Sequence, residues 1–466
     1  MTQTDAISIN IPGSKSLSHR YLIGAALASG RSTIMNCQKS SDVQVTRSLL
    51  TKLGARILEE DDTTLVVEGI AGNVRGGEGS PMDCDVGESG TSCRLLAAVF
   101  AAGNGLFRVF GKGRMHKRPI EELCAALTRL GAGIVYTETS GNPPFLLQAR
   151  GLNPDLVKGE LAVGMDASSQ YFSGLLLASP LCPSPLSLEL GGTKAVSWPY
   201  VGLTLQCLHD FGISFTVETR KHDKDAWSVL EEGNWREVAL VKPGCLRITV
   251  TPAPYRAGTF TLEGDWSNAS YFLAAGALGK RPVHVCGLSE SSLQGDRIFL
   301  EILAKMGAHF EYDASGVTVF PSELHGVDLD MGSCPDLVQT VSVLAAFAQG
   351  STRIHNVAHL RFKETDRLAA PCLELKKIGV VIDTLSDGLL ISGRGGKSHT
   401  KRGASSLPTL PEGTCFSAHN DHRMAMSLAI LDCVNPDLAV QSHIDNPNVV
   451  DKSFPTFWEK WQCLLK

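Results

Sequence analysis

The sequence predicts an α/β protein built from two similar halves. Its 466 residues are enough for two domains, because single hydrophobic cores stop growing at about 250–300 residues. Six stretches of small apolar residues recur along the chain, and a β-branched run follows each one, which is typical of a helix followed by a strand. The stretches end at Gly30, Gly103, Pro180, Gly279, Gly350 and Pro436.

A second helical pattern follows five of these copies. Leucines three and four residues apart mark an amphipathic helix, and the glycine after them predicts its C-terminal end. The pattern occurs as LLTKLGARIL, ALTRLGAGIV, CLHDFGISFT, ILAKMGAHFE and LKKIGVVID, and the final FWEKWQCLL predicts a sixth such helix. Each repeat therefore contains two helices and several short strands, with three repeats on either side of the middle.

Two polar stretches interrupt the repeats. Residues 218–243 lie in the longest gap between copies, and we expect them to form an inserted hairpin or loop. Pro252, Pro254 and Gly258 follow, a composition that favours a linker. Residues 393–414 are rich in Gly, Ser, Lys and Pro and are expected to form another loop.

Composition excludes several classes of function. The formal net charge is −5 and the basic residues are scattered, which argues against a nucleic-acid-binding surface. The 13 cysteines include no CxxC pair, and Cys93, Cys124 and Cys207 lie in apolar stretches, as expected for buried thiols in a reducing cytosol. Residues 1–10 lack the features of a secretion signal, and no apolar run is long enough to span a bilayer. We therefore expect a cytoplasmic protein.

Donors and charges precede each small-residue helix. The starts read PGSKSLSHR, GESGTSCR, DASSQ, GDWSNAS, PDLVQT and HNDHRMAM. Ser, Thr, Asp and Gly are ordinary N-caps, so capping explains any one start taken alone. Capping does not explain Lys15, Arg20, Arg94 or Arg423, because a cation near a helix N-terminus opposes the helix dipole unless an anion binds there. The starts together predict sites for phosphate or carboxylate groups.

The basic segment RMHKRPI has two interpretations. It is either an exposed loop or part of an anion site, and it precedes a helix that we expect from Pro119. Its basic residues are Arg114, His116, Lys117 and Arg118.

The segment RFKETDR also has two interpretations. Lys363, Glu364, Asp366 and Arg367 alternate in sign, which is usual for a solvated, salt-bridged helix start. Alternating cations and carboxylates are also what proton transfer beside an anionic substrate requires. No metal site is predicted, because the histidines of HNDH have no acidic or thiolate partners nearby in sequence.

Eight motifs stand in one order along nearly the whole chain: PGSKSLSHR, GESGTSCR, MHKRPI, ASSQ, EGDWSNASYF, LRFKETDRL, NDHRMAM and DKSFP. Together they resemble the EPSP synthase family of enolpyruvyl transferases. The resemblance implies two domains, each of three βαβαββ repeats around inward-facing helices, which are joined by a two-strand hinge and close on the substrates. Residues 14–258 would form one domain, and residues 1–13 with 259–466 would form the other.

The resemblance also implies a reaction. The family moves the enolpyruvyl group of phosphoenolpyruvate to the 5-hydroxyl of shikimate 3-phosphate by addition and elimination, and inorganic phosphate is released. The expected partners are these two small molecules, bound by a monomer without cofactor, metal, nucleic acid or membrane. A base must take the hydroxyl proton while the methylene carbon gains one. Asp336 matches the base, and Glu364 matches the proton donor and acceptor at the methylene.

Cations and hydroxyls complete the implied site. Lys15 matches a lysine between both substrates, and Lys452 matches one that assists proton transfer or phosphate departure. The implied phosphoenolpyruvate ligands are Lys15, Gly90, Arg118, Gln170, Arg367, Arg423 and Lys452. The implied shikimate 3-phosphate ligands are Lys15, Ser16, Arg20, Ser168, Ser169, Gln170, Ser197, Tyr200, Asp336, His359 and Lys363. Because Gly90 leaves its pocket open, we also expect competitive inhibition by the phosphonate glyphosate.

Four residues depart from the family pattern. Glu88 stands where Asn is usual, Ser41 replaces an acid, Trp198 replaces a basic residue, and His359 replaces an Asn. A carboxylate near phosphoenolpyruvate would repel it, so we expect Glu88 to pair with a neighbouring cation such as Arg94. None of the four departures removes an expected acid, base or arginine.

Three other functions fit the pattern less well. The related transferases that act on UDP-N-acetylglucosamine usually have SGAKN in place of PGSKS, and a cysteine-bearing loop in place of GRMHKRP. A non-catalytic relative that binds shikimate 3-phosphate would not be expected to keep Lys15, Asp336, Glu364 and Lys452. An RNA-processing cyclase built from similar repeats would show basic tracts, which the acidic balance disfavours.

Overall fold

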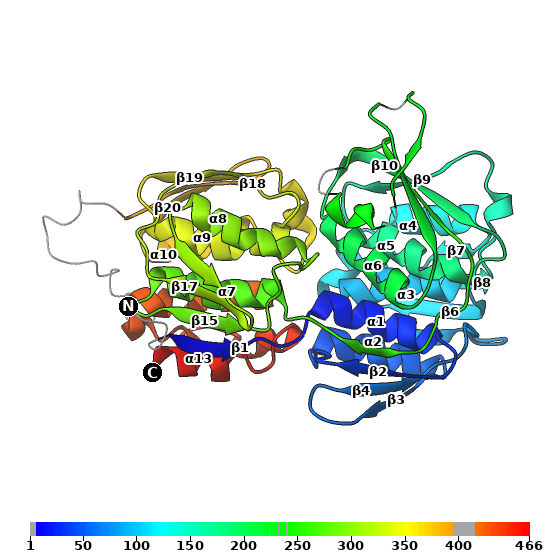
Figure 1. Cartoon of the computed structure of the whole chain (residues 1–466), viewed down its shortest axis with the longest axis horizontal. Helices are drawn as coiled ribbons and strands as arrows, with labels where there is room; N and C mark the ends of the chain where they lie inside the picture. The colour runs from blue at the N-terminus through cyan, green and yellow to red at the C-terminus, as the bar shows by residue number, and fades with distance from the viewer. Residues whose placement is uncertain (1–5, 223, 232, 239–240, 396–414) are drawn as a thin grey trace, which may run out of the picture. The chain divides into compact units, whose positions relative to one another are not determined.

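The chain folds into two compact units. The computed structural model describes residues 6–222, 224–231, 233–238, 241–395 and 415–466. The N-terminal unit is Ser14–Leu262, and the C-terminal unit is Met1–Gly13 together with Glu263–Lys466. The chain therefore passes between the units twice, the second time four residues after the boundary expected from the sequence (Figure 1). Helices and short strands alternate in both units, as the sequence predicts.

The repeat is clearest in the middle of the N-terminal unit. Its sheet has the order β5-β6-β8-β7, in which β5 is parallel to β6 and β8 is antiparallel to both of its neighbours. Along the chain the order of elements is βαβαββ. The elements are β5 (Met82–Asp85), α3 (Gly90–Ala101), β6 (Asn104–Phe110), α4 (Glu121–Arg129), β7 (Gly133–Tyr136) and β8 (Phe145–Arg150).

Two more sheets of the N-terminal unit follow the same plan, in the orders β14-β2-β4-β3 and β12-β11-β13-β10-β9. The first repeat contains α1 (Lys15–Leu27), β2 (Arg31–Met35), α2 (Ser41–Lys52), β3 (Arg56–Glu59), β4 (Leu65–Glu68) and β14 (Thr259–Thr261). The third contains β9 (Leu161–Met165), α5 (Gln170–Ala178), β10 (Leu186–Ala195), α6 (Pro199–Asp210), β11 (Phe215–Thr219), β12 (Ser228–Val229) and β13 (Leu246–Val250).

The C-terminal unit contains two such sheets, β1-β15-β17-β16 and β18-β19-β21-β20. The first repeat has β1 (Ile7–Asn10), α7 (Trp266–Leu278), β15 (Val283–Cys286), α8 (Phe299–Lys305), β16 (His309–Tyr312) and β17 (Gly316–Phe320). The second has β18 (Asp328–Asp330), α9 (Val338–Phe347), β19 (Ser351–His355), α10 (Ala369–Lys377), β20 (Val381–Thr384) and β21 (Leu389–Ser392).

The sixth repeat is described only in part, over residues 415–466. It keeps both expected helices, α11 (His422–Ala429) and α13 (Phe457–Leu465). Within residues 415–466 its strand pairing is reduced to a parallel bridge between Phe416 and Ile444. Most of the loop predicted for residues 393–414 lies outside the described residues.

An exchange of strands accounts for the two passages between units. Strand β1 precedes the N-terminal unit in sequence, yet it pairs in parallel with β15 of the C-terminal unit. Strand β14 comes last in the N-terminal unit and pairs in parallel with β2, near that unit's start. Gly13 and Gly264 form an antiparallel bridge beside the two passages.

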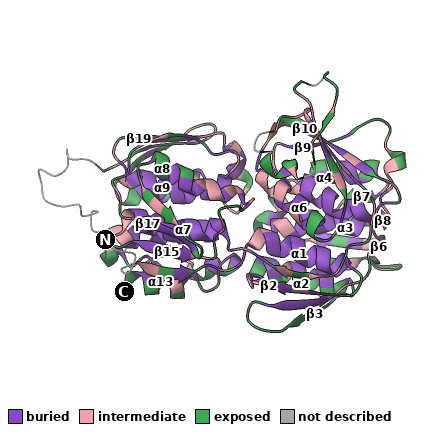
Figure 2. Ribbon diagram, viewed as in Figure 1, coloured by how far each residue is buried: buried purple, intermediate pink, exposed green. Residues whose placement is uncertain are grey.

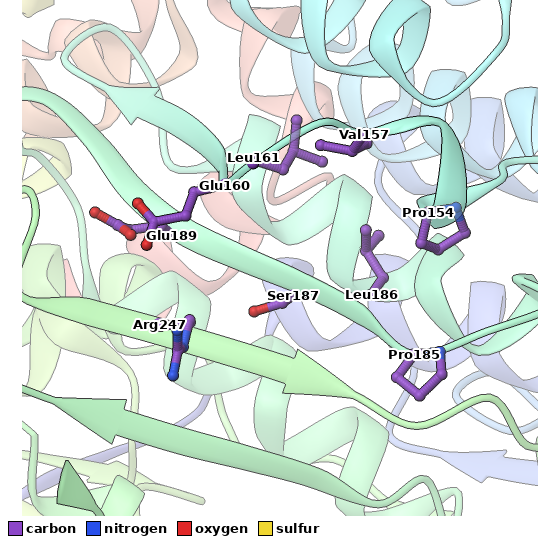
Figure 3. A pocket seen from close by; sticks show the side chains of 10 residues that line it. Pro154, Val157, Glu160, Leu161, Pro185, Leu186, Ser187, Glu189 and Arg247 are labelled. Carbon is purple, nitrogen blue, oxygen red and sulfur yellow. The ribbon is translucent and has the colours of Figure 1, made fainter. Parts of the chain in front are cut away.

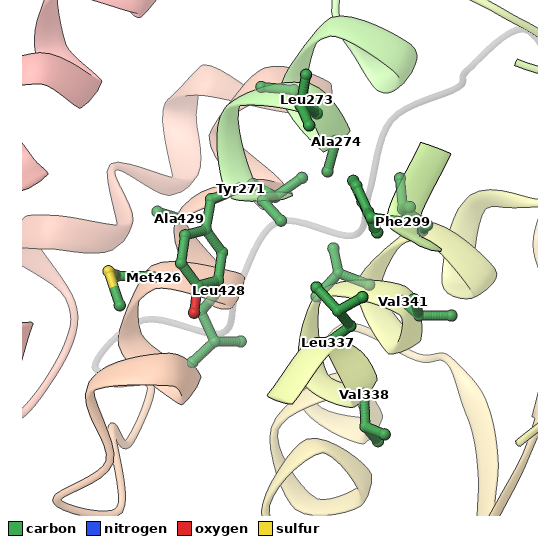
Figure 4. Close-up of a cluster of buried hydrophobic side chains, with 14 of the residues drawn as sticks. Tyr271, Leu273, Ala274, Phe299, Leu337, Val338, Val341, Met426, Leu428 and Ala429 are labelled. Carbon is green, nitrogen blue, oxygen red and sulfur yellow. The ribbon is translucent and has the colours of Figure 1, made fainter. Parts of the chain in front are cut away.

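The six small-residue helices form the cores of the units. Every residue of α3 except Thr91 is buried, and every residue of α7 except Leu278 (Figure 2). Small residues let such helices approach closely: a Cβ added to Gly174 of α5 would lie 2.7 Å from the Arg94 carbonyl oxygen of α3. In the C-terminal unit, apolar side chains of α7, α9 and α11 form one cluster (Figure 4).

Glycines end the amphipathic helices, as predicted. Each adopts a left-handed backbone conformation, with φ between 74° and 106°, which costs glycine little because it lacks a Cβ. These residues are Gly54, Gly131, Gly212, Gly307 and Gly379.

The polar insertion contains a short hairpin, as expected, because β11 and β12 pair through Glu218 with Val229 and Thr219 with Ser228. The stretch Pro252–Gly258 packs into the N-terminal unit and does not form an exposed linker. Its Tyr255 is 2% exposed and donates a hydrogen bond to the Leu177 carbonyl over 2.7 Å. No helix in the described ranges is long and apolar enough to cross a membrane.

Candidate active site

The expected site residues divide between the two units. Those of the N-terminal unit lie at the starts of α1, α3, α5 and α6 and before α4. Those of the C-terminal unit lie before α9 and α10, at the start of α11, and at the end of the 3₁₀ helix η12 (Pro447–Lys452). The structure therefore presents two clusters, one in each unit.

Arg20 is the most deeply buried cation of the N-terminal cluster, at 1% exposure. Its guanidinium donates to Thr204 Oγ1 (2.8 Å), the Ser16 carbonyl (2.8 Å), the Tyr200 carbonyl (2.9 Å) and Ser173 Oγ (3.4 Å). All four partners are neutral, and no carboxylate pairs with Arg20 among the described residues. Burial lowers the pKa of Arg20 to about 10. A buried cation without a counter-ion is costly, so this position favours an incoming anion.

The neighbouring cation Lys15 has a protein partner. Its Nζ lies 3.3 Å from Asp42 Oδ2, the acid that follows the Ser41 departure. His19 lies between Lys15 and Arg20 in sequence, and burial, with these two cations, lowers its pKa well below the usual value. His19 is therefore neutral, and its Nδ1 is 2.7 Å from Thr46 Oγ1. This hydrogen bond ties α1 to α2.

The starts of α3 and α5 are tied together by an amide and a guanidinium. Gln170 Nε2 donates to Thr91 Oγ1 (2.9 Å), and Arg94 donates to Gln170 Oε1 (3.2 Å) and to the Pro119 carbonyl (2.8 Å). Ser168 and Ser169 are buried beside Gln170, and Ser168 Oγ accepts from the Gln170 N–H (3.2 Å).

Gly90 and Arg118 meet at the first turn of α3. A Cβ added to Gly90 would lie 2.5 Å from Arg118 Nη2, so this glycine makes room for the guanidinium. Arg118 is 7% exposed, whereas Arg114 and Lys117 of the same segment are exposed. Arg114 and Lys117 therefore belong to an exposed loop, whereas Arg118 is buried against the first turn of α3. The helix α4 begins at Glu121 and not at Pro119 as expected, and Ile120 is its N-cap residue.

The segment before α6 presents Ser197 in a left-handed conformation (φ 56°) at 7% exposure. The Trp198 side chain contacts the insertion: its Nε1 donates to the Val238 carbonyl (2.6 Å). The departure at Trp198 thus anchors the insertion to α6.

Glu88 lies beside the basic loop. Its Oε1 is 2.5 Å from where a Cβ of Gly113 would stand, and Gly113 begins the 3₁₀ helix η2 (Gly113–Lys117). The expected pairing with Arg94 is not the arrangement found, because Arg94 bonds to Gly90, Gln170 and Pro119. Among the described residues Arg94 has no carboxylate partner.

Arg367 organises the C-terminal cluster. It is 2% exposed and binds three carboxylates: Asp421 through Nε (2.7 Å), Asp336 through Nη1 (2.9 Å) and Glu364 through Nη2 (2.9 Å). Burial alone lowers the pKa of Arg367, but the attraction of Asp421, Glu364 and Asp336 outweighs it and raises the pKa above its usual value.

Two more cations complete this cluster. Arg423 Nη2 lies 2.7 Å from Asp336 Oδ2, so the Asp336 carboxylate bridges two arginines. Lys452 is 7% exposed, and its Nζ is 3.9 Å from Glu364 Oε1. The structure thus brings together Asp336, Glu364, Arg367, Arg423 and Lys452.

The alternating segment RFKETDR divides its charges. Asp366 pairs with Arg361 (3.0 Å) and accepts from the N–H groups of Leu368 and Ala369 just before and at the start of α10, so it is the salt-bridged cap. Glu364 and Arg367 instead face the buried cluster. His359 is 6% exposed in the 3₁₀ helix η8 (Ala358–Phe362), and Lys363 follows that helix.

Sequence reasoning missed three carboxylates. Asp421 is fully buried, caps α11 through the Arg423 N–H (3.0 Å) and orients Arg367. Asp42 pairs with Lys15. Asp296 is 2% exposed and accepts from Ser267 Oγ, and burial, followed by the charge of Asp336, raises its pKa to about 7. Only Asp421 had a sequence signal, because it lies directly before the helix that carries Arg423.

Other polar features lie apart from these clusters. A pocket of about 270 Å³ in the N-terminal unit is lined by residues of β9, β10 and β13, among them Glu189 and Arg247 (Figure 3). It contains none of the expected site residues. His419 of HNDH bonds to Glu374 (Nε2 to Oε1, 2.8 Å). His422 of the same motif is instead buried in α11 beside the C-terminal cluster, with its Nδ1 3.7 Å from Asp421 Oδ1.

A model of the family "EPSP synthase (3-phosphoshikimate 1-carboxyvinyltransferase)" matches residues 4–229 and 239–461. The chain belongs to the EPSP synthase family. The gap between the matched ranges falls inside the insertion at 218–243, and the resemblance seen in the sequence is confirmed. The chain is similar to two relatives named 3-phosphoshikimate 1-carboxyvinyltransferase. That of Shewanella woodyi is 34% identical and that of Mannheimia haemolytica 35%, each over 98% of this chain and 96% of the relative.

Solved structures share the EPSP synthase fold with this chain. An EPSP synthase from Acinetobacter baumannii has a TM-score of 0.70 and 23% identity, over 98% of this chain and 96% of that one. The enolpyruvyl transferase NikO from Streptomyces tendae has a TM-score of 0.68 and 17% identity, over 99% of this chain and 95% of that one. At these identities the likeness establishes the fold, and the α/β class predicted from the sequence is confirmed.

Proposed function

We propose that this chain transfers the carboxyvinyl group of phosphoenolpyruvate to the 5-hydroxyl of shikimate 3-phosphate. Family membership and relatives of that name support the reaction. The observation that carries the proposal for the site is that two carboxylates, Asp336 and Glu364, share one guanidinium, that of Arg367. The shared guanidinium supports the assignment of these carboxylates as base and acid, because proton transfer beside an anionic substrate needs carboxylates next to a cation.

Asp336 takes the proton of the 5-hydroxyl while the hydroxyl oxygen attacks the enol carbon of phosphoenolpyruvate. Glu364 gives a proton to the methylene carbon, which completes the addition. In the elimination Glu364 takes a proton back from the new methyl group, and the C–O bond to phosphate breaks. Lys452, near Glu364, balances the charge of the departing phosphate. These proton transfers require no cofactor.

The N-terminal cluster binds shikimate 3-phosphate. Arg20 supplies a buried positive charge, and hydroxyls near it suit a polyol; the ligands are Lys15, Ser16, Arg20, Ser168, Ser169, Gln170, Ser197 and Tyr200. Asp336, His359 and Lys363 of the C-terminal unit complete the set.

Phosphoenolpyruvate is bound by cations of both units. Lys15, Gly90, Arg118 and Gln170 serve it from the N-terminal unit, and Arg367, Arg423 and Lys452 from the C-terminal unit. Because the reaction joins the two substrates, residues of both units act in one reaction. We further propose that the chain acts as a cytoplasmic monomer on these small molecules, without nucleic acid or membrane, and that its two domains correspond to the units Ser14–Leu262 and Met1–Gly13 with Glu263–Lys466.

Phosphate release from phosphoenolpyruvate tests this function. We expect release with shikimate 3-phosphate as the acceptor and none with UDP-N-acetylglucosamine. Release should fall sharply in Glu364→Ala and Lys15→Ala and persist in Asp383→Asn, which changes an exposed aspartate of β20. A chain that binds shikimate 3-phosphate but releases no phosphate would instead be a non-catalytic relative.

A further inference from the structure

The backbone before Ser197 wraps around one carboxylate. Asp166 follows β9 and is half-buried. Its Oδ1 accepts hydrogen bonds from the N–H groups of Thr193 (3.0 Å) and Lys194 (3.2 Å), and its Oδ2 is also 3.0 Å from the Thr193 nitrogen. The Thr193 hydroxyl donates to the same carboxylate. Asp166 thus accepts hydrogen bonds from a segment of β10 that lies 27 residues further along the chain.

The segment forms a bulge in the pairing of β10 with β9. Gly191 pairs with Gly164 and Ala195 pairs with Met165, so residues 192–194 have no partner on β9. Gly192 has a φ of 83°, and a Cβ there would lie 1.9 Å from Asp166 Oδ2. The backbone therefore passes directly over the carboxylate, at a position only glycine fits. Asp166 satisfies N–H groups that the ladder leaves without a strand partner.

Both ends of this arrangement carry expected substrate ligands. On the near side, Asp166 is two residues before Ser168, whose Oγ accepts from the Gln170 N–H. On the far side, the bulge leads through Ala195 to Ser197 and to Tyr200, whose carbonyl accepts from Arg20 (2.9 Å). One carboxylate therefore ties the segment before α5 to the bulge before α6, in addition to the pairing of β9 with β10 and the hydrogen bonds of Arg20 to Ser173 and the Tyr200 carbonyl.

We propose that Asp166 is a positioning residue for shikimate 3-phosphate. It does not touch the substrate itself. It holds the Ser168–Gln170 and Ser197–Tyr200 segments at the spacing that the phosphate and hydroxyls of one ligand require. This inference rests on the proposed function, because that function assigns both segments to the same ligand.

Three variants test the proposal. Asp166→Ala removes all acceptors, whereas Asp166→Asn keeps an oxygen for the Thr193 and Lys194 N–H groups. Asp61→Ala is the matched control: Asp61 Oδ1 accepts from the N–H groups of Thr63 and Thr64, both 2.7 Å, in a turn between β3 and β4 that carries no expected ligand. Each variant is measured for kcat, for KM of both substrates, for shikimate 3-phosphate binding by calorimetry, and for urea unfolding.

We expect Asp166→Ala to raise the KM and Kd for shikimate 3-phosphate about tenfold, the effect of losing roughly one net hydrogen bond's free energy. Asp166→Asn should recover part of this loss, and the KM for phosphoenolpyruvate should change less than about twofold. Asp61→Ala should leave all constants near wild type. If Asp166→Ala is too unstable to purify, Asp166→Asn is expected to show the same selective rise at a smaller size.

Two results would overturn the proposal while leaving the proposed function intact. In the first, the wild type turns over but the Asp166 variants bind shikimate 3-phosphate as well as Asp61→Ala does. In the second, both KM values rise equally, which indicates general loss of structure. A wild-type chain that neither binds shikimate 3-phosphate nor releases phosphate would instead overturn the proposed function, and this inference with it.

Discussion

Asp336 and Glu364 contact the same side chain: Asp336 Oδ1 and Glu364 Oε2 each lie 2.9 Å from a terminal nitrogen of Arg367. The two carboxylates approach from different segments, one before α9 and the other before α10. A shared guanidinium keeps two negative charges close together at an acceptable electrostatic cost.

Neutralising either carboxylate should slow the reaction. For Asp336→Asn and Glu364→Gln we expect kcat to fall by about 10²–10⁴, the usual contribution of a general acid or base. Steady-state phosphate release measures this, with Asp383→Asn as the control for a carboxylate of the same unit. Wild-type kcat in either variant would show that the residue does not transfer a proton.

Replacing Arg367 with lysine should weaken the cluster although the charge is kept. Lysine cannot contact Asp421, Asp336 and Glu364 with a planar, three-sided set of donors. We expect Arg367→Lys to lose about 2 kcal/mol of unfolding free energy, less than the cost of deleting a buried ion-pair partner outright, and to raise the KM for phosphoenolpyruvate. Urea unfolding and initial rates measure the two effects. Arg353→Lys, which changes an exposed arginine on β19 with a 3.7 Å contact to Asp328, is the control.

A methyl group at position 90 should disturb phosphoenolpyruvate more than shikimate 3-phosphate. The added Cβ would lie 2.5 Å from Arg118 Nη2, so the guanidinium must move. Gly90→Ala should therefore raise the KM for phosphoenolpyruvate and the inhibition constant for glyphosate, which we expect to compete with it. The KM for shikimate 3-phosphate should remain near wild type. An inhibition constant for glyphosate that is independent of phosphoenolpyruvate concentration would contradict the shared pocket.

Asp296 should make the chain less stable as pH rises. Its pKa is raised to about 7, first by burial and then by Asp336, whereas in the unfolded chain an aspartate has a pKa of about 3.9. Between about pH 4 and pH 7 the folded state therefore binds a proton that the unfolded state has released, and stability falls with pH in this window.

The Asp296→Asn variant isolates this effect, because its neutral amide does not titrate. The unfolding free energy of the wild type minus that of the variant should decrease between pH 4.5 and pH 7.5, by about 1.4 kcal/mol for each unit of pKa difference expressed. Urea unfolding at both pH values measures it. A difference that is the same at both pH values would show that Asp296 ionises normally in the folded chain.

Local sequence patterns determined much of the fold. Apolar periodicity located both helices of all six repeats, and the glycines at positions such as Gly54 and Gly307 ended their helices in the left-handed conformation that only glycine adopts easily. Helix periodicity and helix ends depend on residues that are close in sequence, so one amino-acid sequence is enough to predict them. The ordered motifs also identified the family, since eight of them stand in one order along nearly the whole chain.

Tertiary structure alone decided which charges meet. Without the family resemblance, the sequence offered Glu364 and Asp366 as equals, yet Glu364 reaches Arg367, while Asp366 caps α10. It offered Arg20 and Arg423 as similar cations, yet Arg20 has only neutral partners, and Arg423 pairs with Asp336, 87 residues away in the chain. The packing of buried helices from different repeats determines which charged side chains come into contact. Periodicity cannot reveal them, because the energy of a charge depends on its burial and on neighbours that are distant in sequence.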